Sequence, residues 1–187
     1  MHTQDAKRRL VVFTYDIVGT AAIALAIFAL MFAYLFRIVG VDGDSMAPTL
    51  QNGDRLLLSI SGDKYEHGDV IVVDRYTDKP LVKRVIAVGG DTLEIASDGS
   101  VSVNGDILEE PYIRGITVLN DFSGRIEVPK GYLFVMGDNR TISKDSRKAE
   151  IGLVSVKDVV GRAFYCVWPP KNVGEIVYTS HHRRDLK

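Results

Sequence analysis

The chain has 187 residues, with 24 acidic and 23 basic side chains and a formal net charge of −1 at pH 7. The basic residues are dispersed, which argues against nucleic acid as a partner. Cys166 is the only cysteine, so an intramolecular disulfide is excluded, and the histidine spacing fits no zinc site, so we expect neither a metal nor a cofactor.

The first predicted element is an uncharged apolar segment at residues 17–36. A helix of about 20 such residues spans a hydrocarbon core of about 30 Å. Basic residues at 7–9 precede the segment and only Arg37 follows it closely. This asymmetry predicts a cytoplasmic N-terminus at residues 1–16 and an extracytoplasmic body on the plasma membrane. A cleavable signal peptide is the alternative, but its apolar region is shorter, about 7 to 15 residues, so we interpret the segment as a retained single-pass anchor.

The remainder predicts a mainly β fold, because short runs rich in Val, Ile, Leu and Tyr alternate with Gly-Asp turns. The expected strands are residues 55–60, 69–74, 82–88, 92–96, 101–103, 132–136 and 160–167. Asn104-Gly105 indicates a hairpin, and residues 155–159 indicate a short helix. The stretch 92–129 is richer in turn and acidic residues than its flanks, which suggests a small β cap inserted into a larger antiparallel β domain of residues 37–91 and 130–187.

A serine that could act as a nucleophile follows the anchor closely, in the run Asp42-Gly43-Asp44-Ser45-Met46-Ala47-Pro48-Thr49-Leu50. Gly43 and Pro48 constrain the turn around Ser45, where backbone N–H groups can point toward a carbonyl oxygen. An ordinary turn serine is the alternative. No histidine is suitably placed to act as a base, because His67 lies in a polar turn and the others lie at the chain ends. A base for this serine must therefore be a lysine.

Lys83 is the candidate base, because it lies in the apolar run 81–88. Period-two alternation places it on the face of Val85 and Ala87, with Arg84 on the opposite face. An edge strand whose lysine reaches into solvent is one interpretation. A buried lysine is the other. Because an ordinary lysine with a pKa of about 10.4 is neutral in only about one molecule in 2,500 at pH 7, a lysine base requires burial that lowers its pKa.

The third candidate segment is the polar loop 137–147, which directly follows the predicted strand 132–136. Loops at strand ends commonly carry function. A calcium-binding loop would require glycine at its sixth position and glutamate at its twelfth, but Ser143 and Ala149 occupy these positions. A solvated turn is the remaining alternative.

Together, and in this order, these segments resemble bacterial type I signal peptidases, also called leader peptidases, of the Gram-positive kind. The matching segments are residues 43–50, 83–91 and 137–147, with further likeness in the anchor and at residues 52–55, 68–72 and 161–164. The resemblance implies a membrane-anchored serine endopeptidase that removes signal peptides from exported precursor proteins after a small-x-small, Ala-x-Ala-like site. It also implies contact with membrane lipid and proximity to the secretion translocase.

The resemblance further implies a Ser/Lys dyad. Ser45 would attack the scissile carbonyl, Lys83 would be the general base, and Ser143 would hydrogen-bond the lysine amine and orient it. Gly43 stands where other members carry a hydroxyl that holds the oxyanion, so a backbone group or water must serve there. The implied substrate pocket consists of Met46, Leu50 and Val82, and the implied supporting ion-pair network of Arg84, Asp138, Asp145 and Arg147.

Two other functions share some of these features. Self-cleaving repressor proteins use a serine and a lysine on a related β fold, but they are cytosolic and lack an anchor. An inactive relative that assists surface-fibre (pilin) assembly would be anchored. The presence of Ser45, Lys83 and Ser143 together favours an enzyme over that alternative.

Overall fold

The N-terminal helix α1 is continuous from His2 to Leu35 in the computed structural model, which describes residues 2–60, 64–74 and 76–176, with side chains from residue 13 onward. Its apolar part, Phe13–Leu35, has 23 residues and a mean hydropathy of 2.3, long and apolar enough to cross a membrane. The side chains of basic residues 7–9 lie outside the described part, so the orientation of the anchor stays a prediction.

The helix differs from the predicted segment 17–36 at both ends. It begins earlier because no glycine or proline interrupts the chain before residue 17. It ends earlier because Phe36 begins strand β1 (Phe36–Gly40), which pairs with β2 (Arg55–Ser59). The helix and the residues from Ile38 onward are two compact units, each described by itself.

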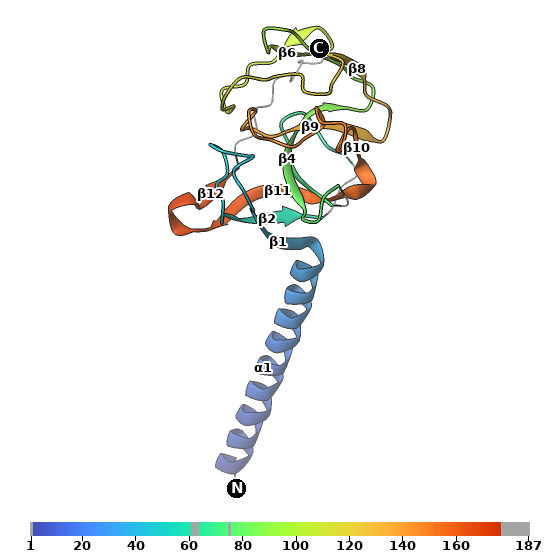
Figure 1. Cartoon of the computed structure of the whole chain (residues 1–187). Coiled ribbons are helices and arrows are strands. Elements are labelled where there is room, and N and C mark those ends of the chain that lie inside the picture. Colours follow the sequence, from blue (N-terminus) through green and yellow to red (C-terminus); the bar gives the residue numbers. More distant parts are fainter. Residues whose placement is uncertain (1, 61–63, 75, 177–187) are drawn as a thin grey trace. The chain divides into compact units, whose positions relative to one another are not determined.

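The second unit is built from antiparallel strands, which confirms the predicted mainly β fold (Figure 1). The further strands are β3 Val70–Val73, β4 Leu81–Val88, β5 Thr92–Ile95, β6 Val101–Val103, β7 Asp106–Ile107, β8 Arg125–Glu127, β9 Tyr132–Met136, β10 Val154–Ser155, β11 Val159–Trp168 and β12 Gly174–Glu175. The predicted helix at 155–159 is one 3-10 turn, Val156–Asp158, capped by the Ser155 hydroxyl. A second 3-10 turn is Pro170–Asn172.

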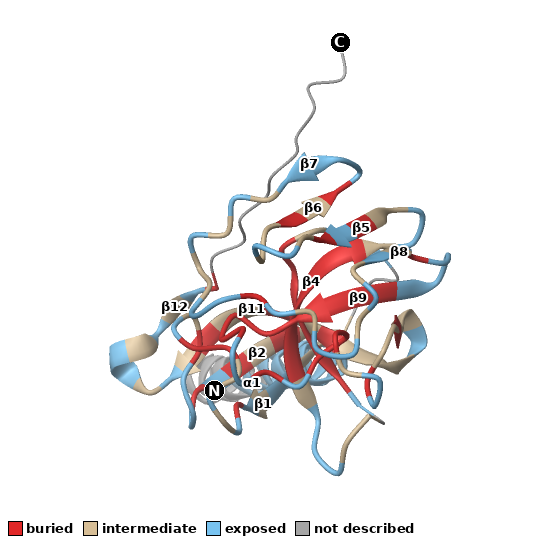
Figure 2. Cartoon of the chain, turned by 45° about the horizontal axis from the view of Figure 1, so that its top comes forward, coloured by how far each residue is buried: buried red, intermediate tan, exposed pale blue. Residues whose placement is uncertain are grey.

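The larger sheet has eight strands in the order β1-β2-β11-β3-β4-β9-β10, with β12 paired to β11. Strand β4 is antiparallel to β3 on one side and to β9 on the other. Lys83 therefore lies on an internal strand, and the edge-strand interpretation is wrong. Figure 2 shows that β4 and β9 are among the most deeply buried parts of this unit.

A separate four-stranded sheet, β7-β6-β5-β8, forms from residues within the predicted cap (Figure 1). Asn104 and Gly105 have φ values of 55° and 88° and connect β6 to β7, as a two-residue hairpin turn requires. Buried side chains from both sheets, including Ile86, Leu93 and Phe134, share one apolar cluster. Whether 92–129 behaves as a distinct domain stays a prediction.

The alternation predicted for β4 is interrupted by a β-bulge. Val85 pairs with Val135 and Ala87 with Phe134, so one extra residue stands between them on β4. As a result, Val85 packs in one apolar cluster, whereas Ala87 joins Ile86 in another. The predicted common face for Val85 and Ala87 is wrong, because a bulge shifts the side chains beyond it to the other face.

Candidate active site

Ser45 lies in a tight turn that is anchored in the core on either side of it. Met46 is fully buried and Leu50 is 2% exposed, and the Leu50 N–H donates to the Met46 carbonyl at 2.9 Å. Gly43 has φ of +93°, a conformation that favours glycine. Ser45 itself is only partly buried.

Lys83 contacts this serine from the interior of the sheet. Its side-chain Nζ donates to Ser45 Oγ and to the Val82 carbonyl, each at 2.8 Å. Lys83 is only 2% exposed. Burial lowers the pKa of Lys83 from 10.5 to about 8, although Asp145 and Asp138 partly oppose this by favouring the charged form. A substantial fraction of Lys83 is therefore neutral slightly above neutral pH, in contact with a hydroxyl that can donate a proton to it.

The backbone N–H groups of this turn differ in whether they already donate a hydrogen bond. The Gly43 N–H donates to Asn52 Oδ1 at 3.0 Å. Over residues 2–60, 64–74 and 76–176, the Ser45 N–H has no hydrogen-bond acceptor. The Ser45 N–H is thus a candidate donor for a developing oxyanion, and a supporting role for Gly43 stays a prediction.

The polar loop 137–147 docks directly on the serine turn. The Asn139 N–H donates to the Ser45 carbonyl at 2.9 Å, and Asn139 Nδ2 donates to the Asp44 carbonyl at 3.2 Å. Gly137 permits this approach, since a Cβ there would lie 2.4 Å from the Ser45 carbonyl oxygen and 2.3 Å from Ser143 Oγ. Asn139 was not singled out in the sequence, because nothing in its neighbours indicates this long-range contact.

The predicted hydrogen bond between Ser143 and the lysine amine is not formed. Ser143 is 3% exposed, and its hydroxyl makes no hydrogen bond of good geometry within the described part of the chain, although it lies close enough to the Asp145 carboxylate to help lower the pKa of that group. The Lys83 amine bonds Ser45 and Val82 instead. The Ser143 hydroxyl packs against Gly137, because the absence of a side chain at Gly137 leaves room for it. A role for Ser143 in orienting Lys83 stays a prediction.

The four residues of the predicted ion-pair network form two buried, bidentate pairs. Arg84 donates to Asp138 at 2.9 and 2.7 Å, and Arg147 donates to Asp145 at 2.9 and 2.8 Å. Burial would raise the pKa of Asp145, but the Arg147 guanidinium, together with the Gly137 N–H and the Ser143 hydroxyl, holds that pKa below its usual value. Removing one member of such a pair leaves an uncompensated buried charge and costs about 3 to 5 kcal/mol.

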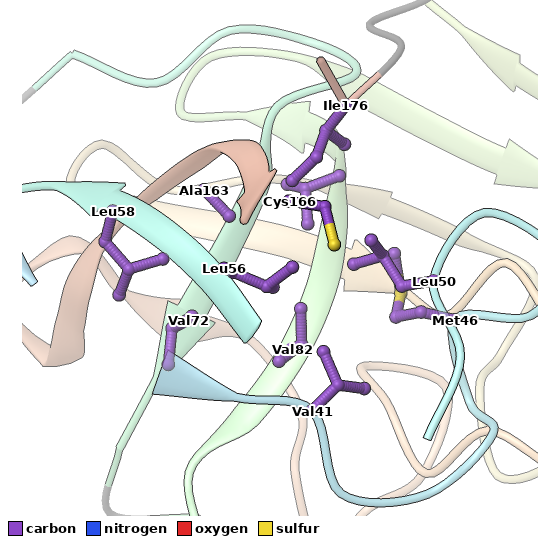
Figure 3. Close-up of a cluster of buried hydrophobic side chains, with 11 residues drawn as sticks. Val41, Met46, Leu50, Leu56, Leu58, Val72, Val82, Ala163, Cys166 and Ile176 are labelled. Carbon is purple, nitrogen blue, oxygen red and sulfur yellow. The ribbon is translucent and has the colours of Figure 1, made fainter. Parts of the chain in front are cut away.

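The predicted pocket residues Met46, Leu50 and Val82 lie together in one apolar cluster (Figure 3). All three are buried, and Val82, the most exposed of them, is 6% exposed. Val82 is also the residue whose carbonyl accepts from Lys83. The structure therefore places these apolar side chains next to the candidate dyad, and Leu50 also lines a cavity of about 380 Å³ with Pro48 and Tyr112. A role for the three residues in binding substrate stays a prediction.

A cavity of about 910 Å³ lies beside the serine turn. Asp44, Ala47 and Pro48 line it from the turn, and Arg114 and Ile142 line it from the facing segments. Its walls are mixed in polarity.

Potential metal ligands do not gather near the site. Cys166 is 3% exposed, and its thiol donates to the Trp168 carbonyl at 3.2 Å. Burial raises the pKa of this thiol, consistent with the buried, unreactive cysteine expected from its aromatic neighbours. Within the described ranges, no three His, Cys, Asp or Glu side chains come close enough to hold a metal ion. The expected absence of metal and cofactor stays a prediction.

Sequence reasoning missed several residues that support the site. Thr49 Oγ1 donates to Asp138 Oδ2 at 2.5 Å, and Arg140 forms a third buried ion pair with Glu110. Arg140 belongs to a segment that the sequence analysis did single out. Glu110 lies in the predicted cap, 30 positions away, and no local pattern connects the two.

Comparisons with known proteins identify the family of this chain. The family profile of signal peptidases, peptidase S26, matches residues 14–168. A signal peptidase I of Bacillus amyloliquefaciens is 37% identical over 160 residues, which cover 79% of this chain and 81% of the relative. A probable signal peptidase I of Mycobacterium leprae is 31% identical over 237 residues, covering 92% and 81%. A solved signal peptidase I from Enterococcus faecalis is 28% identical, with a TM-score of 0.45 over 56% of this chain and 98% of that chain.

Proposed function

Because the chain belongs to the signal peptidase family, peptidase S26, whose members are serine endopeptidases that remove signal peptides, we propose that Ser45 and Lys83 are its catalytic dyad. The observation that carries this proposal is the 2.8 Å contact between Lys83 Nζ and Ser45 Oγ, with the lysine buried and its pKa lowered to about 8. A lysine in this state can act as a general base near neutral pH.

In the proposed mechanism, neutral Lys83 accepts the hydroxyl proton of Ser45 while Oγ attacks the scissile carbonyl carbon. The carbonyl oxygen becomes an oxyanion that accepts a hydrogen bond from the Ser45 N–H. As the C–N bond breaks, the lysine ammonium gives its proton to the departing amine, and an ester to Ser45 remains. Lys83 then takes a proton from a water molecule that attacks this ester, and gives that proton to Ser45 Oγ as the ester bond breaks, which releases the acid and regenerates the serine and the neutral lysine.

The substrate would be an exported precursor bound in extended form across the serine turn, with small side chains one and three residues before the cut. Met46 and Val82 are almost fully buried and tightly packed, so a site bounded by them has little depth for a side chain. Leu50, in the same cluster, completes the proposed apolar wall. Such a wall accepts alanine and excludes larger groups.

The proposed setting is the plasma membrane. The apolar part of α1 would anchor the chain with its N-terminus in the cytoplasm and the β unit outside, because basic residues at 7–9 precede it. The enzyme would then meet precursors close to the lipid surface, near the translocase that delivers them.

We expect detergent-solubilised protein to cut a precursor carrying an Ala-x-Ala site directly after the second alanine. Replacing that alanine by leucine should lower kcat/KM by about 100-fold, because the extra methylenes have no space against the buried wall. Mass spectrometry of the released fragments gives both the position and the rate of cleavage.

The matched control places leucine at the middle residue of the same site. Successive side chains of an extended peptide point to opposite sides, so this change should alter kcat/KM by less than about threefold. An intact precursor after prolonged incubation would contradict the proposal and favour the non-cleaving assembly protein.

Activity should rise with pH between 6 and 9. Lys83 has a lowered pKa of about 8, and only its neutral form accepts the serine proton, so kcat/KM at pH 6 should be about one hundredth of its alkaline plateau. The measurement is initial cleavage rate against pH with a substrate that lacks titrating groups near the cut. A flat profile over this range would show that no titrating lysine controls the rate, provided circular dichroism finds the protein folded throughout.

A further inference from the structure

Residues 108–121, here called the strap, run from the cap sheet along the loop 137–147. At its middle, Arg114 forms a parallel β-bridge with Asn139. The Arg114 N–H donates to the Asp138 carbonyl at 2.7 Å, and the Arg140 N–H donates back to the Arg114 carbonyl at 2.9 Å. The strap therefore pairs through its backbone with the part of the loop that holds the serine turn.

The side chain of Glu110 reinforces this pairing from the strap. Glu110 forms a bidentate pair with Arg140, whose Nη1 donates to Glu110 Oε2 at 2.9 Å and whose Nη2 contacts Oε1. The Arg140 side chain is fully buried and that of Glu110 is 7% exposed. Arg140 also donates to Thr117 Oγ1 at 2.7 Å and to the Gly137 carbonyl at 3.2 Å. One buried guanidinium thus joins two points of the strap to the start of the loop.

The strap also contacts the two ion pairs that the sequence did predict. The Tyr112 ring lies 4.1 Å from the Arg84 guanidinium carbon, and the Tyr112 hydroxyl donates to Glu110 at 2.9 Å. Arg147 donates to the Val118 carbonyl at 3.2 Å and to the Arg140 carbonyl at 2.9 Å. All three buried arginines around the loop therefore have a partner on the strap.

We infer that the strap is a positioning element for the candidate catalytic loop, and that Glu110 is a positioning residue that acts through Arg140. The inference rests on the proposed function for its consequence in catalysis. The path has three contacts. Glu110 pairs with Arg140, and Arg140 donates to the Gly137 carbonyl. In the same loop, the N–H of Asn139 donates to the Ser45 carbonyl at 2.9 Å. The cap thereby contributes to the placement of the nucleophile without touching the substrate.

Glu110→Gln tests this assignment, because it keeps the size of the side chain and removes the charge that compensates Arg140. Amide hydrogen exchange of the full chain in detergent should become at least about tenfold faster in peptides covering residues 137–147, since the strap no longer holds the loop closed. Unchanged exchange there would overturn the inference. This readout does not depend on any cleavage activity.

Activity gives the second readout. Glu110→Gln should lower kcat by about 10- to 100-fold with KM changed less than about twofold, because a misplaced nucleophile slows the chemical step more than binding. The midpoint of the pH profile should also move upward as water reaches Lys83, which faces the carboxylates of Asp138 and Asp145. A kcat and midpoint equal to wild type would contradict the positioning role even if the variant melts at a lower temperature.

Tyr76→Phe is the matched control for lost stability. Tyr76 lies outside both strap and loop, and its hydroxyl donates to Asp158 at 3.2 Å and accepts from the Ser155 N–H at 2.9 Å. This variant should lose stability with wild-type kcat and wild-type exchange over 137–147. If both variants lowered kcat equally, the strap effect would be ordinary destabilisation and the inference would fail. If wild-type protein cleaved nothing, the proposed function would fail, and the exchange result would still decide the inference.

Discussion

Lys83→Met is expected to abolish precursor cleavage, with kcat/KM reduced by at least about 10⁴-fold. Methionine fills a similar volume but cannot accept the proton of Ser45, which Lys83 contacts at 2.8 Å. The variant should still fold, because the side chain lies among apolar neighbours on an internal strand. The measurement is single-turnover cleavage of an Ala-x-Ala precursor at pH 9, where most of the wild-type lysine is neutral.

The same substitution should also change the stability of the protein, in a direction that does not depend on catalysis. The folded pKa of about 8 is lower than the ordinary 10.5, so the unfolded chain binds the proton more tightly. Wild-type stability therefore rises as pH increases from 8 to 10.5, and below pH 8 the buried charge costs about 3 kcal/mol. Methionine removes this cost but loses two hydrogen bonds worth about 1 kcal/mol each.

Lys83→Met should consequently be about 1 kcal/mol more stable than wild type at pH 7 and less stable above pH 10.5. Urea denaturation at several pH values measures this difference. Lys79→Met is the control, because Lys79 is an exposed lysine whose charge loss should change stability little at any pH. A Lys83→Met variant with wild-type cleavage, or one destabilised equally at all pH values, would remove Lys83 from the role of buried base.

Ser45→Ala is expected to reduce cleavage by at least about 10⁴-fold while leaving the fold intact. The substitution removes the proposed nucleophile but keeps the backbone carbonyl that accepts from Asn139 at 2.9 Å. Met46 and Leu50, which anchor the turn in the core, are unchanged. We expect thermal unfolding within about 4 °C of wild type, because only one hydrogen bond from Lys83, worth about 1 kcal/mol, is lost.

Ser100→Ala provides the comparison for loss of a serine hydroxyl elsewhere. Ser100 lies in a cap turn, where its hydroxyl donates to Asp98 at 2.7 Å. This variant should cleave at the wild-type rate. Retention of cleavage by Ser45→Ala would exclude Ser45 as the nucleophile, and the trapped ester expected on Ser45 by mass spectrometry after acid quenching should likewise be absent in that variant.

The local elements of this fold could be read from the sequence because their signals are local. The apolar run of α1 and the short runs rich in Val, Ile, Leu and Tyr in β2, β3, β4, β9 and β11 depend only on neighbouring residues. Asn104-Gly105 forms its hairpin because both residues tolerate positive φ. Some strands were not predicted, such as β7 and β10, which have only two residues and form because they pair with a neighbouring strand.

The candidate site was less predictable, because each of its decisive contacts joins distant segments. Ser143 was expected to bond Lys83, but its hydroxyl packs against Gly137 and makes no hydrogen bond of good geometry within the described chain. Glu110 was not considered, since an acidic residue in a turn-rich segment ordinarily points to solvent. Ala87 was placed on the wrong face because a bulge leaves no periodic signal in a single strand.

The sequence by itself determined an apolar N-terminal helix, a mainly β body, and the serine and lysine whose chemistry points to peptide cleavage. Only the tertiary structure decided that Lys83 is buried on an internal strand, 2.8 Å from Ser45, and that the loop 137–147 is held by a strap from the cap. The physical reason is that the desolvation of a side chain depends on every element packed around it. The strands β3, β4 and β9 and the docked loop must all close around one amine before its pKa can fall.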